Sequence, residues 1–352
     1  MYSDYNMRVI DRKYIRLIPI ILQVLNMSCT GPVKDERPPI ILSDTLSVIR
    51  ERDLIPEGTA YDPNTHLVFI SSMYKRKIVA IEPSGRYYDF VDSGEDDLWG
   101  TLGMAVDSIR NQLWVISTKG KPLPAYPEIT DDRWQSRLYS YDIPTEKLVG
   151  IFEPQQLNNE EIGFNDLTLA KNGDVYITES INNKIYVLKY GSRHIEMFLK
   201  LTDFTFPNGI TFAEDNKALF VSCTEGLLKI NVATKTYQVL KSEFTTLPQP
   251  IDGLAFFENS LIGHHGSVIR QFFLDDSLDS IIRQKIVDDQ NLNSSTTGEV
   301  GSEGWYYYIA NSQIRSGVDY ANKRIKPLDS LQDVIIKRRK LGQAPSKVLQ
   351  NR

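Results

Sequence analysis

Cysteine is nearly absent from the chain, since only Cys29 and Cys223 occur among 352 residues. A disulfide scaffold and a metal centre built from cysteines are therefore excluded. Positive charge is not in excess either, because the net charge is −5 and the isoelectric point is near 5.6. That balance gives no reason to expect a nucleic-acid partner. Helical periodicity strong enough to predict a second domain is also lacking.

The one apolar stretch near the N-terminus, residues 17–25, is too short to span a membrane as a mature helix. Four basic residues precede it, as they do in export signals: Arg8, Arg12, Lys13 and Arg16. The segment that follows, Leu-Asn-Met-Ser-Cys ending at Cys29, resembles a bacterial lipoprotein box. We therefore expect residues 1–29 to be a signal segment of the lipoprotein type, with a plain secretory signal and an anchoring N-terminus as alternatives. The expected location is periplasmic or at the cell surface, with membrane attachment through a lipidated Cys29.

The rest of the chain divides by composition into a tether, one large domain and a tail. Residues 30–42 are polar and contain prolines, which is typical of a tether. From residue 43 onward, short runs rich in β-branched and aromatic residues alternate with turn clusters. We expect a single all-β domain over residues 43–340 and a frayed tail over residues 341–352.

A short phrase recurs six times along this domain: a polar or small residue, usually a Gly, an apolar alternation, a turn and a strand. The copies begin at Pro56, Thr101, Gly163, Phe206, Pro250 and Thr296. Most copies are separated by 43–45 residues, which is the length that four strands and their turns need. The sequence thus predicts a six-bladed β-propeller with four-stranded blades around a central channel. A strand within residues 46–52 would close the ring by pairing beside residues 333–337.

The interval between the second and third copies is longer, at 63 residues from Leu102 to Asn165. The excess lies between Lys119 and Arg137, where three prolines at 122, 124 and 127 break regular pairing. We expect a long loop there that shapes access to the channel. Three aromatic residues in or near it would either form a pocket wall or pack in the loop: Trp99, Tyr126 and Trp134.

The position before the Gly of each phrase carries the chemistry; in the third copy Asp166 replaces that Gly. In chain order it is Glu57, Leu102, Asn165, Asn208, Asp252 and Thr297. Innermost strands of a propeller start at one end of the channel, so equivalent positions form a ring. A single Asn or Asp before Gly is more often a turn residue. Four in phase, with two carboxylates and two carboxamides, predict a site for Ca²⁺, another divalent cation being the alternative; Zn²⁺ would prefer His or Cys.

The phrases PEGTAYDP, FNDLTLAKNGDVYITES, FPNGITFAEDNKALFVS and IDGLAF resemble the senescence-marker-protein/gluconolactonase (regucalcin-like) family. They also resemble its paraoxonase-like, diisopropylfluorophosphatase and strictosidine synthase-like relatives. The resemblance covers roughly residues 50–315 and implies a six-bladed propeller with a catalytic divalent cation. Glu57, Asn208 and Asp252 match the family's ligands, and Asn165 matches a ligand or a substrate contact.

The resulting expectation is a calcium-dependent hydrolase of small lactones or esters. The cation polarises the carbonyl, and Asp252 takes a proton from the attacking water. His265 is expected to line the pocket as a second catalytic group, and His264 to contact substrate. Gluconolactonases often carry Arg where this chain has Gly163, so a clamp for sugar-acid hydroxyls is not expected. The alternatives are a non-catalytic propeller braced by calcium and a metal-free condensation; the sequence does not predict the oligomeric state.

Overall fold

The computed structural model describes residues 44–120, 133–155, 160–244 and 251–343. The expected signal segment, the tether, Cys29, Tyr126 and most of the expected tail lie outside the described residues, as do residues 121–132 of the second-blade loop. The chain from Ser43 onward forms one compact unit, which is described here by itself.

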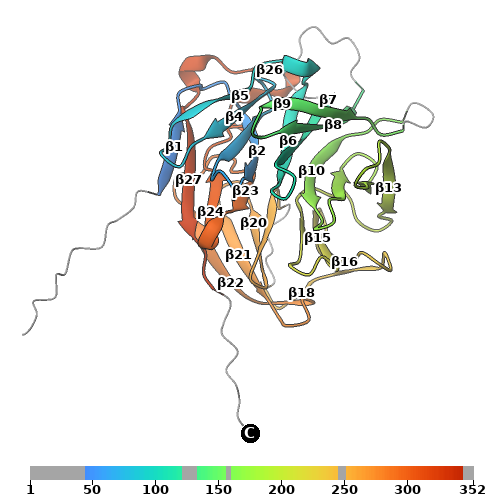
Figure 1. Cartoon of the computed structure of the whole chain (residues 1–352). Coiled ribbons are helices and arrows are strands. Elements are labelled where there is room, and N and C mark those ends of the chain that lie inside the picture. Colours follow the sequence, from blue (N-terminus) through green and yellow to red (C-terminus); the bar gives the residue numbers. More distant parts are fainter. Residues whose placement is uncertain (1–43, 121–132, 156–159, 245–250, 344–352) are drawn as a thin grey trace, which may run out of the picture. The chain divides into compact units, whose positions relative to one another are not determined.

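Six antiparallel sheets follow one another in chain order, so the predicted six-bladed β-propeller is confirmed (Figure 1). The first blade is β2 (Pro56–Tyr61), β3 (Val68–Ser72), β4 (Lys77–Ile81) and β5 (Tyr87–Val91). The second is β6 (Gly100–Asp107), β7 (Gln112–Lys119), β8 (Gln135–Asp142) and β9 (Lys147–Phe152). The third is β10 (Phe164–Leu169), β11 (Val175–Glu179), β12 (Lys184–Leu188) and β13 (Ile195–Lys200).

The fourth blade keeps the simple four-stranded plan, whereas the fifth and sixth depart from it. The fourth is β14 (Ile210–Phe212), β15 (Ala218–Cys223), β16 (Gly226–Asn231) and β17 (Tyr237–Val239). The fifth is β19 (Leu254–Phe257), β20 (Ser260–His264), β21 (Ile269–Leu274) and β22 (Ser280–Asp288), with the short β18 (Lys241–Ser242) parallel to β22. The sixth is β23 (Gly298–Val300), β24 (Trp305–Ile309), β27 (Val334–Lys340) and β1 (Thr45–Ile49).

The sixth blade closes the ring with strands from both ends of the chain. Strand β1 pairs antiparallel with β27, with Ile49 opposite Val334, and the two lie side by side in Figure 1. Both Ile49 and Val334 are completely buried. The expected pairing of a strand near residues 46–52 with residues 333–337 therefore occurs.

Strands in the middle of each blade are buried on both faces, because every sheet packs between two neighbouring sheets. All residues of β3 and β4 are buried, whereas the outer strand β9 alternates between exposed and half-buried positions. This explains why the middle strands are continuous apolar runs instead of alternating ones. Cys223, at the end of β15, lies in such an inter-blade core, and burial raises the pKa of its thiol to about 12.

The innermost strands of all six blades line a central channel. A small cavity of about 90 Å³ lies along it, and each of β2, β6, β10, β14, β19 and β23 contributes to its wall. The starts of these strands therefore meet at one end of the channel, called here the mouth.

An insertion interrupts the sixth blade between β24 and β27. It contains a hairpin of β25 (Val318–Asp319) and β26 (Arg324–Ile325) with the short 3₁₀ turns η3 (Tyr320–Asn322) and η4 (Leu328–Ser330). Two further 3₁₀ turns are η1 (Glu95–Asp97) and η2 (Ser302–Gly304). Within the described residues, no helix is both long and apolar enough to cross a membrane.

The closure of the ring predicts an asymmetry between neighbouring residues of β1. Replacing Ile49 with Ala deletes side-chain atoms that are completely buried against β27, and should lower the free energy of unfolding by about 2–5 kcal/mol. Replacing Val48, which is 43% exposed, with Ala should lower the free energy of unfolding by less than about 1 kcal/mol. Urea denaturation of both variants measures the difference. Equal losses would contradict this register.

Candidate functional site

The four predicted ring residues lie at the mouth, where the innermost strands begin. Glu57 and Asn165 are the second residues of β2 and β10, whereas Asn208 and Asp252 come two residues before β14 and β19. Glu57 and Asn208 are 6% and 7% exposed, and the other two are half-buried. Leu102, the apolar member of the repeat, is also buried.

Three of the four converge closely. The Asn208 Nδ2 donates a hydrogen bond of 3.0 Å to Asp252 Oδ1. The charge of Asp252 in turn acts on Glu57, whose pKa it raises. Asn165 Nδ2 donates instead to Ser180 Oγ at 3.1 Å, and its Oδ1 makes no hydrogen bond to a described residue. The structure thus brings Glu57, Asn208 and Asp252 together and presents Asn165 beside them with a free amide oxygen.

Negative charge at this place is costly without a cation. Burial and the nearby charge of Asp252 raise the pKa of Glu57 well above its usual range, and burial raises the pKa of Asp252 to about 6. The Oε2 atom of Glu57 is buried and has no hydrogen-bond partner among the described residues. An uncompensated carboxylate pair in a desolvated site favours either a proton or a positive ion.

The donor set fits a hard cation. It offers the orphaned Glu57 Oε2, the Asp252 carboxylate and the free amide oxygen of Asn165, and Ca²⁺ prefers oxygen ligands of this kind. Among the described residues, no group of three or more His, Cys, Asp and Glu is arranged to hold a metal. Two of the four predicted ligands are asparagines, so this site does not contain three residues of those four types. Zn²⁺, which prefers His and Cys, fits it poorly.

A proline precedes two of the ring residues and is itself preceded by a strained residue. Ile55 and Phe206 have φ angles of 43° and 53°, and Pro56 and Pro207 lead directly into Glu57 and Asn208. Positive φ is a rare conformation for a β-branched residue such as Ile55. Strain of this kind persists only where the surrounding structure over-determines it, and it is concentrated at functional sites. The backbone is therefore bent sharply just before both side chains.

Buried hydroxyls hold the ring backbone from the neighbouring blades. Thr296 Oγ1 and Thr297 Oγ1 donate to the carbonyl oxygen of Glu57 at 2.7 and 2.6 Å. Thr178 Oγ1 donates to the carbonyl oxygen of Asn208 at 2.7 Å. These roles were not predicted from the sequence. A signal for Thr178 was present, because Ser or Thr lies at the end of the second strand in four copies of the repeat (FISS, VIST, YITES and FVSC), whereas Thr296 and Thr297 lie just before the innermost strand of the sixth copy.

The histidine predictions need one correction. His264 is completely buried, and its Nδ1 and Nε2 are hydrogen-bonded to Ser295 Oγ at 2.9 Å and Tyr306 Oη at 2.6 Å. No ring nitrogen is left for a substrate, so the substrate-binding assignment of His264 is wrong. This histidine links the fifth and sixth blades as the hydroxyls link the others, and burial lowers its pKa to about 3.

His265 has the opposite character. The residue is half-buried, and both of its ring nitrogens are shielded from solvent without a hydrogen-bond partner among the described residues. Burial and the positive charges of Arg270 and Arg315 lower its pKa, so the ring is neutral at pH 7. A neutral imidazole with unused nitrogens can accept a proton or hydrogen-bond a ligand.

Two further carboxylates lie deeper in the channel, and the sequence argument did not single them out. Asp166 and Glu299 both line the small cavity, and burial raises the pKa of each to about 7. Asp166 was visible only as the residue that replaces Gly in the third copy. The charges of Asp166 and Asp252 both raise the pKa of Glu57, so negative potential extends along the channel axis.

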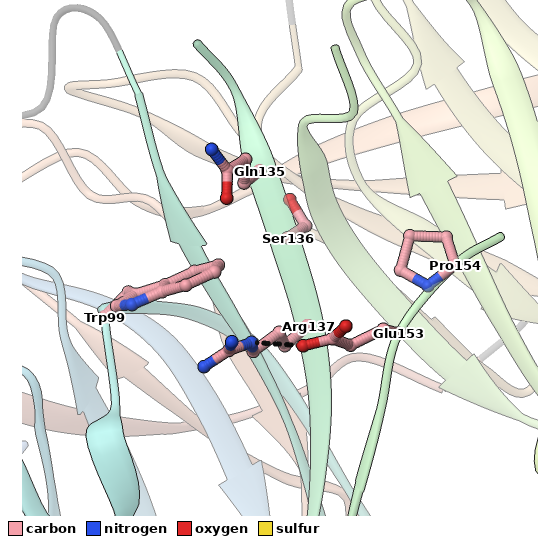
Figure 2. Close-up of a pocket in the computed structure, with 6 residues that line it drawn as sticks. All are labelled: Trp99, Gln135, Ser136, Arg137, Glu153 and Pro154. Atoms are coloured by element: carbon pink, nitrogen blue, oxygen red, sulfur yellow. Dashed lines mark hydrogen bonds and ion pairs between the residues drawn. The ribbon is translucent and has the colours of Figure 1, made fainter. Parts of the chain in front are cut away.

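A separate polar pocket of about 290 Å³ lies beside the second blade, where the loop was expected to shape access (Figure 2). Arg137 lies between Trp99 and Glu153; its guanidinium carbon is 4.2 Å from the centre of the Trp99 ring, and its Nε donates to Glu153 Oε1 at 2.7 Å. Strand β8 already begins at Gln135, so the irregular segment ends earlier than predicted. Trp99 lines this pocket, whose lining includes none of the ring residues, so its expected place in a wall of the channel pocket stays a prediction.

The comparisons with known proteins agree with this architecture. Residues 55–256 match the family model described as the SMP-30/gluconolactonase/LRE-like region. No curated protein matches the chain.

Solved structures with the same fold include a gluconolactonase of Xanthomonas campestris (14% identity over 85% of this chain and 89% of that chain, TM-score 0.58). A second is a calcium-binding regucalcin of Agrobacterium tumefaciens (13% identity over 86% and 97%, TM-score 0.56). A third is the aldose sugar dehydrogenase of Streptomyces coelicolor with bound PQQ (12% identity over 84% and 96%, TM-score 0.53). At these identities the likeness shows the fold alone, and the three neighbours differ in what they do.

The channel carboxylates predict a pH-dependent stability. The folded pKa of Glu299, about 7, exceeds the value of about 4.3 for an unfolded Glu. Burial of the Glu299 carboxyl therefore does not lower the free energy of unfolding of the wild type below about pH 4. The free energy of unfolding falls as the pH rises from about 4 through about 7. With chelator present, Glu299→Gln should be more stable than the wild type at pH 8 by about 2–3 kcal/mol, and the difference should vanish near pH 4. Urea denaturation between pH 4 and 8 measures it. A difference independent of pH would show that the Glu299 carboxyl does not titrate as described.

Proposed function

Because the chain belongs to the SMP-30/gluconolactonase/LRE-like family, we propose that it is a calcium-dependent hydrolase of lactones or esters. Membership in this family supports a lactonase-type hydrolase, and to this we add the proposed dependence on calcium. The observation that carries it is the convergence of Glu57, Asn208 and Asp252 at the mouth, with a buried oxygen of Glu57 left unpaired.

Glu57, Asn208 and Asp252 would hold the cation, with the amide oxygen of Asn165 as a fourth ligand or a substrate contact. A bound divalent cation supplies Lewis acidity toward the substrate carbonyl and lowers the pKa of water. The chain itself supplies the proton acceptors. Asp252 lies at the mouth beside Asn208, and its carboxylate is the proposed acceptor of a proton from the attacking water.

His265 is the second proton acceptor in this proposal. Its imidazole is neutral at pH 7, and both of its nitrogens are unused, so it can accept a proton from water or donate one to the leaving alkoxide. Leu102 and Ile55 belong to one apolar cluster at the mouth. Their packing excludes water from one side of the site and strengthens the charge interactions there.

The metal requirement is tested first with a panel of lactones and aryl esters, assayed with calcium and after chelation. Turnover should disappear with chelator and return with added Ca²⁺. Glu57→Gln, which keeps the shape of the side chain but removes one charge, should weaken calcium binding at least about tenfold in a calorimetric titration. Glu299→Gln, the same change deeper in the channel, serves as the matched control and should keep calcium uptake. Tight calcium binding without turnover of any substrate would favour the non-catalytic alternative, and no calcium uptake would refute the ring as a metal site.

The role of Asp252 is tested by its conversion to Asn. The amide keeps an oxygen for the neighbouring Asn208 but cannot take up a proton, so kcat should fall at least about a hundredfold on any lactone that the wild type hydrolyses. Without calcium the variant should melt at the same or a higher temperature, because a buried carboxylate has been removed. Thermal denaturation and steady-state kinetics give both values. Unchanged kcat would remove Asp252 as the base.

A further inference from the structure

The insertion of the sixth blade covers part of the mouth. Val318 is 5% exposed, and Ile314, Tyr320 and Ile325 pack in the same apolar cluster. That cluster also contains Ile55, Met73 and Leu102. Ile55 precedes Glu57 by two residues, and Leu102 occupies the second-blade place of the ring, so the hairpin β25–β26 lies against the mouth itself.

Two amide side chains, those of Gln313 and Asn311, anchor the base of the insertion by binding backbone groups on the returning segment. Gln313, which is 2% exposed, donates from Nε2 to the carbonyl oxygen of Gln332 at 2.9 Å and accepts from the Gln332 N–H at 2.8 Å. Asn311 similarly donates to the carbonyl oxygen of Asp333 and accepts from the Ile335 N–H. These polar residues have no visible role in the repeat. Their role in the structure is to fix where the insertion leaves and rejoins the blade.

Arg315 lies on the turn that this base supports. The residue before it is held by the Tyr320 hydroxyl, which donates to the carbonyl oxygen of Ile314 at 3.0 Å. The residue after it is held by the Ser316 hydroxyl, which donates to Asn293 Oδ1 at 3.0 Å. The backbone of Arg315 is thus fixed on both sides while its side chain remains exposed.

The guanidinium group is directed toward the site. A Cβ atom added to Gly266 would lie only 3.3 Å from Arg315 Nη1, so the group rests against the backbone directly after His265. Its charge lowers the pKa of both Asp252 and His265, which places it within electrostatic range of both proposed proton acceptors. Arg315 forms no hydrogen bond or ion pair with another residue of the described ranges. A fixed backbone thus presents an unused bidentate donor at the edge of the mouth.

Gly163 on the third blade has no side chain that could bind an anion. A Cβ atom added there would lie 2.6 Å from Ile181 Cγ1, so any side chain at this position would require Ile181 to move. The expectation that no arginine clamp arises from this position is therefore consistent with the packing. With Ca²⁺ bound, the charges of Glu57 and Asp252 would be balanced, and Arg315 would add a positive charge at the edge of the mouth.

From this arrangement we propose that Arg315 binds a carboxylate group of the substrate, and that the site prefers lactones or esters carrying such a second anionic group. Arginine binds carboxylates through two parallel hydrogen bonds, which fixes orientation as well as adding affinity. The proposal rests on the proposed hydrolase function for its substrate class, but the binding of the anion can be measured without turnover.

The kinetic arm compares phthalide with 5-carboxyphthalide, two lactones that differ by one carboxylate, in the presence of calcium. Wild-type kcat/KM should favour 5-carboxyphthalide. Arg315→Gln should lower kcat/KM for that substrate about ten- to hundredfold and change it less than about twofold for phthalide. Arg315→Lys should restore part of the preference, because it keeps the charge but not the two-pronged geometry. Arg324→Gln, on the same insertion and 71% exposed in its side chain, is the control and should match the wild type.

The binding arm uses calorimetry with the two ring-opened products, 2-(hydroxymethyl)benzoate and 2-(hydroxymethyl)terephthalate. Wild type should bind the dianion at least about tenfold more tightly than the monoanion, and Arg315→Gln should abolish that difference. This result without turnover of either lactone would refute the hydrolase proposal and leave the role of Arg315 supported. Equal binding of the two products by the wild type, no binding of either, or an equal loss for both in Arg315→Gln would overturn the inference.

Discussion

Negative charge buried along the channel axis is the constraint on which the rest of this structure depends. Glu57, Asp252, Asp166 and Glu299 come from four different blades, and burial raises the pKa of each. Because six innermost strands start around one axis, the side chains at or near their first residues share one desolvated space. Apolar side chains would be cheaper to place there, as Leu102 illustrates. A set of carboxylates that is destabilising by itself is therefore best understood as a set adapted to a positive ligand.

The hydrogen bonds between blades explain how such a site keeps its geometry. The carbonyl oxygens of Glu57 and Asn208 accept from hydroxyls of Thr297 and Thr178, which belong to neighbouring blades. His264 makes the equivalent connection from the fifth blade to Ser295 and Tyr306. Glu57 and Asn208 are thus each fixed by a neighbouring blade as well as by their own blade. Closure of the sixth blade by β1 and β27 completes this circle, so ring stability and site geometry depend on the same contacts.

Features that follow the repeat could be predicted from the sequence, and features that do not follow it could not. The blade count and the positions of Glu57, Asn208 and Asp252 come from residues in phase at intervals of 43–45. His264 and His265 are adjacent, but only His264 belongs to strand β20, which ends there, and the two side chains differ in their surroundings. The sequence does not say which of them is enclosed, because that depends on whether Ser295 and Tyr306 lie close enough to bind an imidazole.

Arg315 shows why the remainder needed a structure. It lies in an insertion that has no counterpart in the repeat, and its relation to Gly266 depends on how the hairpin folds back over the mouth. The proposed cation ligands lie at the starts of the innermost strands, so the positions of these strands are constrained by the geometry of the site. Insertions between strands escape that constraint and can change length and charge without disturbing the ring. A propeller of this kind can therefore keep one set of cation ligands while its insertions determine which substrates reach it.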